Sequence, residues 1–153
     1  MKKLVLAALL TTFTFGAAAA EKISFGVSAT YPPFESMDAN NQIVGFDLDL
    51  AKALCKQMQA ECTFTNHAFD SLIPALKFKK YDAVISGMYV TPERQKQADA
   101  IPYALSGASI IALKGGAVQP KTEDELCGVK VGLQAGTCLL YTSDAADDMQ
   151  CVD

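Results

Sequence analysis

Strand and helix patterns alternate along residues 22–85, and this alternation restricts the possible folds more than any other feature of the sequence. Apolar residues alternate with polar ones in the first segment and form short continuous runs in two later segments. In the two stretches that separate these three segments, apolar residues repeat at helical spacing. The predicted strands are residues 22–27, 62–65 and 83–85, and the predicted helices are residues 47–59 and 71–78. This order of elements predicts an α/β fold with a mostly parallel sheet and helices packed on its faces.

Turn-forming residues mark the remaining segments. Residues 28–42 contain Pro32-Pro33 and Asn40-Asn41, so we expect a loop there, followed by a short extended piece at Ile43-Val44. Beyond residue 90 the patterns predict a helix over 91–98, strands over 109–113 and 129–133, and a very short helix between those strands, capped by Thr122 and Glu125.

Polar and aromatic residues follow all three strands predicted within residues 22–85, at the edge where ligands bind in parallel α/β folds. They are Ser28, Thr30, Tyr31 and Phe34 after the first strand, Asn66, His67 and Phe69 after the second, and Ser86, Gly87 and Arg94 after the third. Arg94 falls in the first turn of a predicted helix, where the helix dipole disfavours a cation. Because a guanidinium binds a carboxylate through two parallel hydrogen bonds, this edge predicts a carboxylate pocket.

A simpler interpretation of the same residues stays open. Arg94 can be a surface side chain paired with Glu93 or Asp99, the aromatic rings can be core residues, and His67 can be a loop residue near the cleft. A second small-residue segment, residues 134–137, can present backbone N–H groups to an anion.

The first twenty residues have the features of a cleavable signal peptide, with Lys2-Lys3, an apolar stretch over residues 4–16 and small residues before residue 21. Export leads to an oxidising compartment, where the five cysteines can form bridges. A bridge between Cys55 and Cys62 would close a short loop and contribute about 2.5 kcal/mol. Five is odd, so at least one thiol is unpaired within the chain, and the pairing of Cys127, Cys138 and Cys151 stays open.

Charge and histidine content exclude two classes of function. The formal net charge is −4 and there is no basic stripe, which argues against a nucleic-acid partner. The one histidine has no nearby pair of cysteines at zinc-ligand spacing, which disfavours a metal site.

Five motifs follow one another between residues 30 and 88. They are Thr30-Tyr-Pro-Pro-Phe-Glu, Val44-Gly-Phe-Asp-Leu-Asp-Leu-Ala, Cys55-x6-Cys62, Phe69-Asp-Ser-Leu-Ile-Pro-Ala-Leu and Tyr81-Asp-Ala-Val-Ile-Ser-Gly-Met. Together they resemble the periplasmic polar amino-acid-binding proteins of ABC importers, solute-binding protein family 3, and among these the arginine-binding members. Thr91-x-x-Arg94 and residues 131–137 continue the resemblance more loosely.

The resemblance implies how the chain is divided. Residues 1–20 would be the signal peptide, and residues 21–111 a periplasmic-binding-protein-like lobe with a mostly parallel sheet. Residues 112–137 would begin a second α/β lobe, which we expect to be incomplete in this sequence. Residues 138–153 resemble nothing in the family and are expected to be a non-native tail.

The resemblance also implies a role for each matched residue. Arg94 would clamp the α-carboxylate of one free amino acid, and Ser86 and Gly87 would hydrogen-bond its polar end. Thr137 would add a backbone N–H from the second lobe. The acidic residue that holds the ligand α-amino group in relatives has no counterpart that we can assign in this sequence.

Two aromatic residues and two cysteines complete the implied set. Tyr31 and Phe69 would enclose the ligand side chain, and their rings suit a guanidinium or ammonium group. Cys55 and Cys62 match a structural disulfide of relatives. No cofactor and no metal are implied.

Three residues depart from the family pattern. Tyr89 stands where relatives carry Ser, Thr or Asp against the ligand, and we keep it as a ligand-binding candidate with a hydroxyl and an added ring. Ser28 stands where lysine- and histidine-preferring relatives carry Asp. Cys138 replaces a small hydroxyl residue in the second lobe.

The resemblance predicts a binding protein and not an enzyme. The ligand is expected to be a free polar or basic L-amino acid, arginine first, with lysine, ornithine, histidine and glutamine as other candidates. The protein is expected to be a periplasmic monomer that delivers its ligand to the membrane subunits of an ABC transporter.

An enzyme on the same fold is the alternative function. A cyclohexadienyl- or prephenate-type dehydratase would need a positioned acid, and Glu35 or Asp70 is the candidate general acid, although no second catalytic residue is evident. Otherwise both acids are expected to cap a helix or to pair at the surface.

Overall fold

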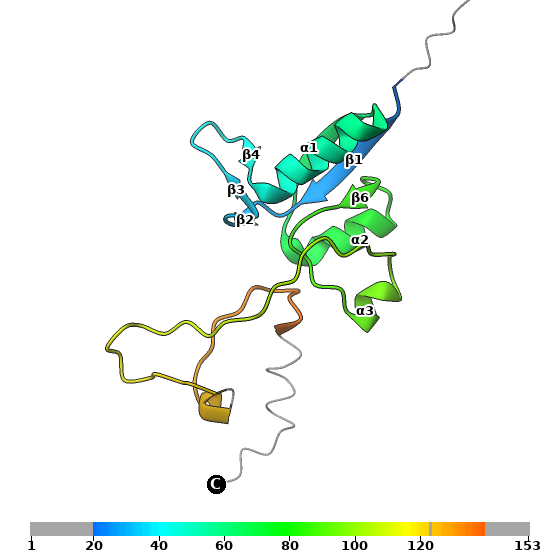
Figure 1. Cartoon of the computed structure of the whole chain (residues 1–153). Coiled ribbons are helices and arrows are strands. Elements are labelled where there is room, and N and C mark those ends of the chain that lie inside the picture. Colours follow the sequence, from blue (N-terminus) through cyan, green and yellow to red (C-terminus); the bar gives the residue numbers. More distant parts are fainter. Residues whose placement is uncertain (1–19, 123, 140–153) are drawn as a thin grey trace, which may run out of the picture.

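The computed structural model of the chain describes residues 20–122 and 124–139 (Figure 1). Residues 22–85 form a compact unit of strands and helices, which we call the α/β body, and residues 99–139 form a less regular part beside it. The predicted signal peptide, apart from residue 20, and most of the predicted tail lie outside the described residues, as does Cys151. Every helix in the described ranges is too short or too polar to span a membrane.

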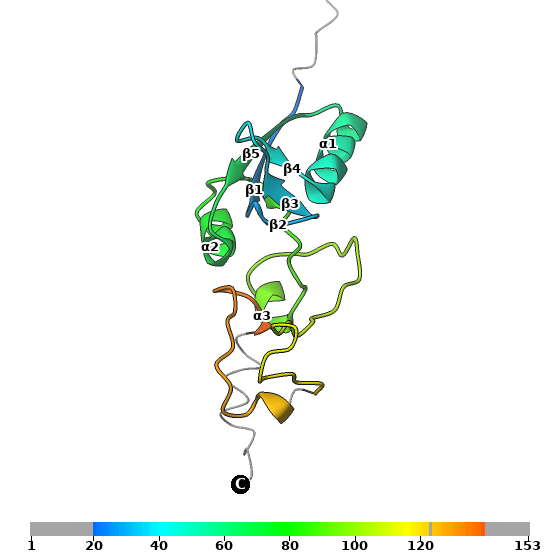
Figure 2. The same ribbon diagram turned by 90° about the vertical axis from the view of Figure 1, so that its left-hand side faces the viewer.

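A three-stranded parallel sheet forms the centre of the α/β body. Strand β1 (Lys22–Val27) lies between β5 (Glu61–Asn66) and β6 (Ala83–Val84), and Phe25 is paired with Phe64 on one side and with Ala83 on the other. Helices α1 (Phe46–Met58) and α2 (Leu72–Lys77) cover opposite faces of this sheet, and the short helix η1 (Phe69–Ser71) leads into α2 (Figure 2). The predicted parallel sheet with a helix on each face is confirmed.

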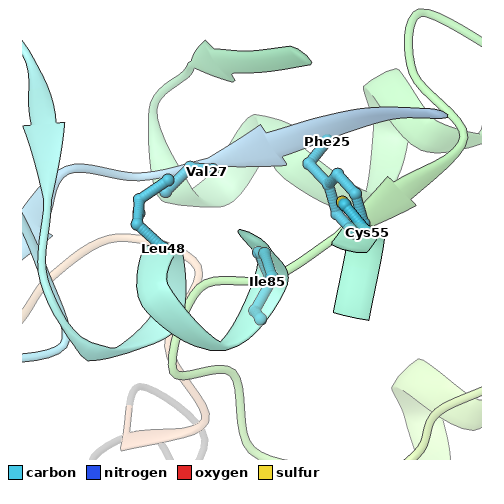
Figure 3. Packing of buried hydrophobic residues seen from close by; sticks show 6 residues of the cluster. Phe25, Val27, Leu48, Cys55 and Ile85 are labelled. Carbon is cyan, nitrogen blue, oxygen red and sulfur yellow. The ribbon is translucent and has the colours of Figure 1, made fainter. Parts of the chain in front are cut away.

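Alternate residues of β1 build the core on the α1 side. Phe25 and Val27 are buried against Leu48 and Cys55 of α1, and Ile85 closes the cluster after β6 (Figure 3). Each such side chain contributes about 1.5–3 kcal/mol when it leaves water. The predicted disulfide is confirmed, since Cys55 of α1 is bonded to Cys62 of β5 with their Cα atoms 6.2 Å apart.

On the α2 side, the hydroxyl end of a tyrosine ring packs against the backbone of β1. A Cβ added to Gly26 would lie 2.6 Å from Cε2 of Tyr81, so only glycine leaves room for this ring. The Tyr81 hydroxyl donates to the carbonyl of Leu72 at 2.7 Å, which ties α2 to the sheet. Leu72 and Ala75 complete this second buried cluster.

The prediction that residues 28–42 form a loop is wrong. An antiparallel sheet occupies this region, with the order β2 (Thr30–Tyr31), β3 (Glu35–Met37) and β4 (Ile43–Val44). Tyr31 pairs with Glu35 across the two prolines, and the carboxylate of Asp38 accepts N–H groups of Asn40 and Gln42 at 2.8 Å in the next turn. Strands of two or three residues are too short to show an alternating pattern.

The strands predicted over 109–113 and 129–133 are absent from the structure. Ile111 and Leu113 are 92% and 82% exposed, so no described helix or sheet covers their side chains. A strand needs a neighbour for its backbone groups as well as a surface to pack against, and neither is present among the described residues.

Two short helices appear near their predicted positions. Helix α3 (Pro92–Gln95) begins at Thr91, whose hydroxyl accepts the Arg94 N–H, and ends before residue 98. Helix η2 (Asp124–Leu126) lies at the position predicted for a short capped helix. The Glu125 carboxylate accepts the backbone N–H of Lys121, however, and not that of Thr122.

Candidate functional site

One open cavity of about 1600 Å³ lies between the carboxyl edge of the parallel sheet and residues 107–122 and 126–139, which supply most of its lining. All seven residues that the sequence proposes as ligand contacts line it, namely Tyr31, Phe69, Ser86, Gly87, Tyr89, Arg94 and Thr137. Of the other residues predicted at this edge, Ser28 and Thr30 also line the cavity. The cavity is larger than one amino acid would fill, because typical ligand pockets have volumes of about 300–1,000 Å³.

Arg94 projects from α3 and joins two parts of the chain. Its Nη1 donates to the carbonyl of Tyr89 at 2.7 Å, and its Nη2 donates to the carbonyl of Gly136 at 2.8 Å. The pairing of Arg94 with Glu93 or Asp99 is not observed, since Lys22 and Glu61 form the one ion pair of the described residues. A guanidinium has five N–H groups, so three remain for a carboxylate.

The two predicted aromatic contacts stand in different surroundings. Tyr31 is 45% exposed, stacks on Phe34 with ring centroids 5.2 Å apart, and lies over Gly87. Phe69 is half-buried, and one face of its ring carries the Arg94 guanidinium with Cζ 5.6 Å from the centroid. Tyr31 therefore offers the more open ring to a ligand.

Ser86 and Gly87 form a tight elbow after β6, and its polar groups are already hydrogen-bonded. The buried Ser86 hydroxyl accepts the Ser28 N–H at 2.9 Å and donates its proton to Oε1 of Glu35 at 2.7 Å. Gly87 has a left-handed backbone, φ +51°, and its N–H donates to Oδ2 of Asp47 at 2.7 Å. The elbow is thus held by the acids behind it.

Asp47 was not predicted to be part of the site, and Glu35 was considered only as a general acid of the alternative enzyme. Glu35 and Asp47 are 1% and 0% exposed, so the expectation that Glu35 caps a helix or pairs at the surface is wrong. Burial, and after it the neighbouring Asp47, raise the pKa of Glu35 while the hydrogen bond from Ser86 lowers it, and together they bring this pKa to about 8. A signal existed in the sequence, because Asp47 shares a helical stripe with the buried residues Ala51 and Cys55.

Tyr103 reaches the same acids from the segment after α3. Its hydroxyl donates to Oδ1 of Asp47 at 2.9 Å and lies 3.1 Å from the Gly87 nitrogen. Burial and the hydrogen bond to Asp47 raise the pKa of Tyr103 above its ordinary value. Asp47 therefore accepts hydrogen bonds on both carboxylate oxygens.

Residues 134–137, which we call the 134–137 turn, lie directly against the α/β body. Gln134 donates to the Thr30 hydroxyl at 3.1 Å, and Gly136 packs on Asp70 so closely that an added Cβ would lie 2.6 Å from Cα. The N–H of Thr137 points to the Gln134 carbonyl at 3.3 Å, within the turn itself. In this arrangement the turn closes one side of the cavity.

Two other candidates from the sequence, His67 and Asp70, lie outside the cavity, whereas Cys138 lines it. His67 packs near Tyr81, with ring centroids 5.6 Å apart, and Asp70 is exposed. Neither is among the lining residues. Cys138 is a free thiol, which agrees with the odd number of cysteines. In the described part of the chain, no group of three or more His, Cys, Asp or Glu residues is arranged to hold a metal ion.

Sequence comparison identifies the family. Residues 23–134 match the profile of the bacterial extracellular solute-binding proteins, family 3. The chain belongs to this family. As a family 3 protein it has the expected α/β fold with a parallel sheet, and its matched relatives are transport binding proteins and not enzymes.

Three relatives show how near the match is. ABC transporter arginine-binding protein 1 of Escherichia coli K12 is 70% identical over 90% of this chain and 56% of its own length. The lysine/arginine/ornithine-binding periplasmic protein of the same strain is 42% identical over 94% of this chain and 58% of its own. A solved ancestral arginine-binding protein bound to arginine has a TM-score of 0.79 at 39% identity, over 86% of this chain and 58% of that one. This family 3 chain therefore spans a little over half the length of the relatives it matches.

Proposed function

We propose that this chain binds a free basic or polar L-amino acid, arginine first, and delivers it in the periplasm to the membrane subunits of an ABC transporter. The observation that carries this proposal is the gathering of all seven candidate residues around one cavity. The arginine-, lysine- and ornithine-binding relatives support the choice of ligand.

In the proposed complex, Arg94 binds the α-carboxylate of the ligand. Two of its N–H groups hold backbone carbonyls, which fixes the plane of the guanidinium, and the remaining donors are available for a carboxylate. A clamp held in place in this way has little rotamer freedom left to lose on binding.

The ligand side chain lies against Tyr31 in this proposal. A guanidinium or ammonium group over an aromatic face gains about 0.5–2 kcal/mol. Phe69 serves mainly through Arg94, whose guanidinium covers one face of its ring. Gly87, Tyr89 and Thr137 shape the cavity, and the Ser86 hydroxyl keeps one lone pair for a ligand donor.

The division of the chain is proposed on the same basis. Residues 1–20 are the signal peptide, residues 21–111 the first lobe, and residues 112–137 the start of a second lobe, while residues 138–153 are a non-native tail. The 134–137 turn supports this division, because it reaches back to the first lobe through Gln134, Gly136 and the hydrogen bond from Arg94. We propose that the protein acts as a monomer.

Isothermal titration with arginine, lysine, ornithine, histidine and glutamine tests the function, with leucine and glutamate as controls. Arginine should bind most tightly, and the two controls should give no binding heat. A prephenate dehydratase assay on the same sample should show no turnover, because Glu35 is engaged in the cavity wall and Asp70 lies outside the cavity. Binding of leucine as tight as that of arginine would overturn the proposal.

A further inference from the structure

Glu35 and Asp47 form a buried pair of acids. They come from β3 and from the first turn of α1, and they lie behind the Ser86-Gly87 elbow. The titratable groups that face Glu35 from the surrounding elements are Asp47 of α1 and Tyr103 of the segment after α3. No Lys or Arg of the described residues forms an ion pair with either acid.

The hydrogen bonds around Glu35 and Asp47 determine which of the two acids carries a proton. Asp47 accepts on both oxygens, from the Gly87 N–H and from the Tyr103 hydroxyl, as an ionised carboxylate does. Oε1 of Glu35 accepts the Ser86 proton, because the Ser86 oxygen already accepts the Ser28 N–H. Oε2 of Glu35 is buried, and it is the one such side-chain oxygen of the described residues without a hydrogen-bond partner.

A second negative charge at this position would be unpaired and out of contact with water. Ionised carboxylates that share a buried site repel each other, so one of the two keeps its proton. Since Asp47 has the donors and Glu35 Oε2 has none, the proton belongs on Glu35, where it can be donated to Asp47.

We infer that Glu35 is a neutral carboxylic acid at neutral pH, and that it is a positioning residue that holds the Ser86-Gly87 elbow at the wall of the cavity. The raised pKa of Glu35, about 8 and caused mainly by burial, agrees with this inference. Glu35 acts through Ser86, and Asp47 acts through the backbone of Gly87 and through Tyr103.

The state of Glu35 can be observed directly in the full chain, without any ligand. With ¹³C-labelled glutamate, NMR should show one side-chain carboxyl carbon that titrates near pH 8, whereas an ordinary glutamate titrates near 4.5. That signal should disappear in Glu35→Gln. In Asp47→Asn the midpoint should shift down by at least one pH unit, because the repelling charge is gone. A Glu35 signal that titrates near 4.5 in the parent chain would overturn the inference.

Glu35→Gln and Glu35→Ala separate positioning from mere packing. Glutamine keeps an acceptor for Ser86 and a donor toward Asp47, so the amide signals of Ser86 and Gly87 should stay near their parent positions and become insensitive to pH. Alanine removes the acceptor, and amide exchange at both residues should rise at least tenfold. Equal amide shifts and exchange in the two variants would refute the positioning role. Failure of the chain to bind arginine would leave these readouts intact.

Discussion

The guanidinium of Arg94 lies over the ring of Phe69, with Cζ 5.6 Å from the ring centroid. The contact joins α3 to η1, two elements that the sequence separates by a strand and a helix. One face of the Phe69 ring is therefore already covered by the protein's own cation, the Arg94 guanidinium. Arg94 therefore lines the cavity and at the same time joins two parts of the chain.

Replacing Arg94 with alanine should abolish amino-acid binding. Hydrogen bonds to charged groups are worth about 1.5–3 kcal/mol each, so loss of a clamp of two such bonds corresponds to a fall in affinity of about a hundredfold or more. Arg94→Lys should bind with intermediate affinity, because lysine keeps the charge but not the bidentate geometry. Titration calorimetry measures the change. Lys121 also lines the cavity, and Lys121→Ala should bind like the parent; unchanged binding by Arg94→Ala would show that the carboxylate site lies elsewhere.

Gly136→Ala should release the 134–137 turn from the α/β body. The new Cβ would lie 2.6 Å from Cα of Asp70, at a backbone φ of +77° that favours glycine. Overpacking of this kind costs about 1–3 kcal/mol. Hydrogen exchange should accelerate in residues 68–71 and 134–137, and arginine binding should weaken.

Substitutions at two other glycines are controls for the Gly136→Ala experiment. They distinguish the effect of the contact with Asp70 from the effect of backbone strain. An added Cβ has open space at Gly132 and at Gly128, and Gly128 shares the positive φ, at +73°. Gly132→Ala should behave like the parent, and Gly128→Ala should show the effect of φ alone. If Gly128→Ala loosened residues 68–71 as much as Gly136→Ala did, contact with Asp70 would not be the cause.

Gly26→Ala should destabilise the α/β body strongly. The methyl group would overlap the ring of Tyr81, which is buried and bonded to Leu72 and cannot swing away freely. We expect a loss of about 1–3 kcal/mol or more in the free energy of unfolding, measured with urea. Gly107→Ala, at a position with open space, should change it by less than about 0.5 kcal/mol.

Removal of the Cys55–Cys62 bridge should lower stability by about 2.5 kcal/mol in the chain-entropy model. The double variant Cys55→Ala, Cys62→Ala and reduction with dithiothreitol should both show this loss in urea unfolding. Cys138→Ser removes a free thiol and should have no such effect. A reduced chain as stable as the oxidised one would mean that the packing of α1 on β5 already fixes this loop.

Stability should also depend on pH through Glu35. Its pKa is raised from 4.5 to about 8 in the folded chain, so the folded state holds a proton that the unfolded state has released. The stabilising contribution of Glu35 to the free energy of unfolding is fully present below about pH 4.5 and is lost as the pH rises through 8. Urea unfolding between pH 5 and 9 should show the parent losing stability relative to Glu35→Gln as the pH rises. Parallel profiles of the two proteins would contradict the assignment.

Elements with a clear period could be predicted from the sequence, and elements that depend on distant partners could not. Strand β1 and helix α1 carry their patterns within one segment, and each was placed to within a few residues. By contrast, β2 and β3 contain two and three residues, and their pairing depends on the turns that join them. Residues 109–113 have the composition of a strand, but among the described residues nothing pairs with them.

The same division holds for the site. Tyr31, Phe69 and Arg94 follow strands, so topology alone brought them to one edge. The engagement of Ser86 by Glu35 could not be predicted, because it depends on an antiparallel strand of three residues, too short to show an alternating pattern. Asp47 was visible on the buried stripe of α1, but its acceptor role depends on Gly87 and Tyr103, which come later in the chain.

Strand β1 is the first strand in the chain and the middle strand of the parallel sheet. Its partners begin only at Glu61 and Ala83, so the growing polypeptide cannot complete the sheet until β6 has been made. Pairing over such separations is slow, since long loops must close before any contact is gained. The Ser86-Gly87 elbow follows β6 directly, and one wall of the cavity is consequently assembled in the last step of this folding sequence. A nascent chain that stalls before residue 83 would leave one edge of β1 unpaired, and an unpaired strand edge is prone to aggregation.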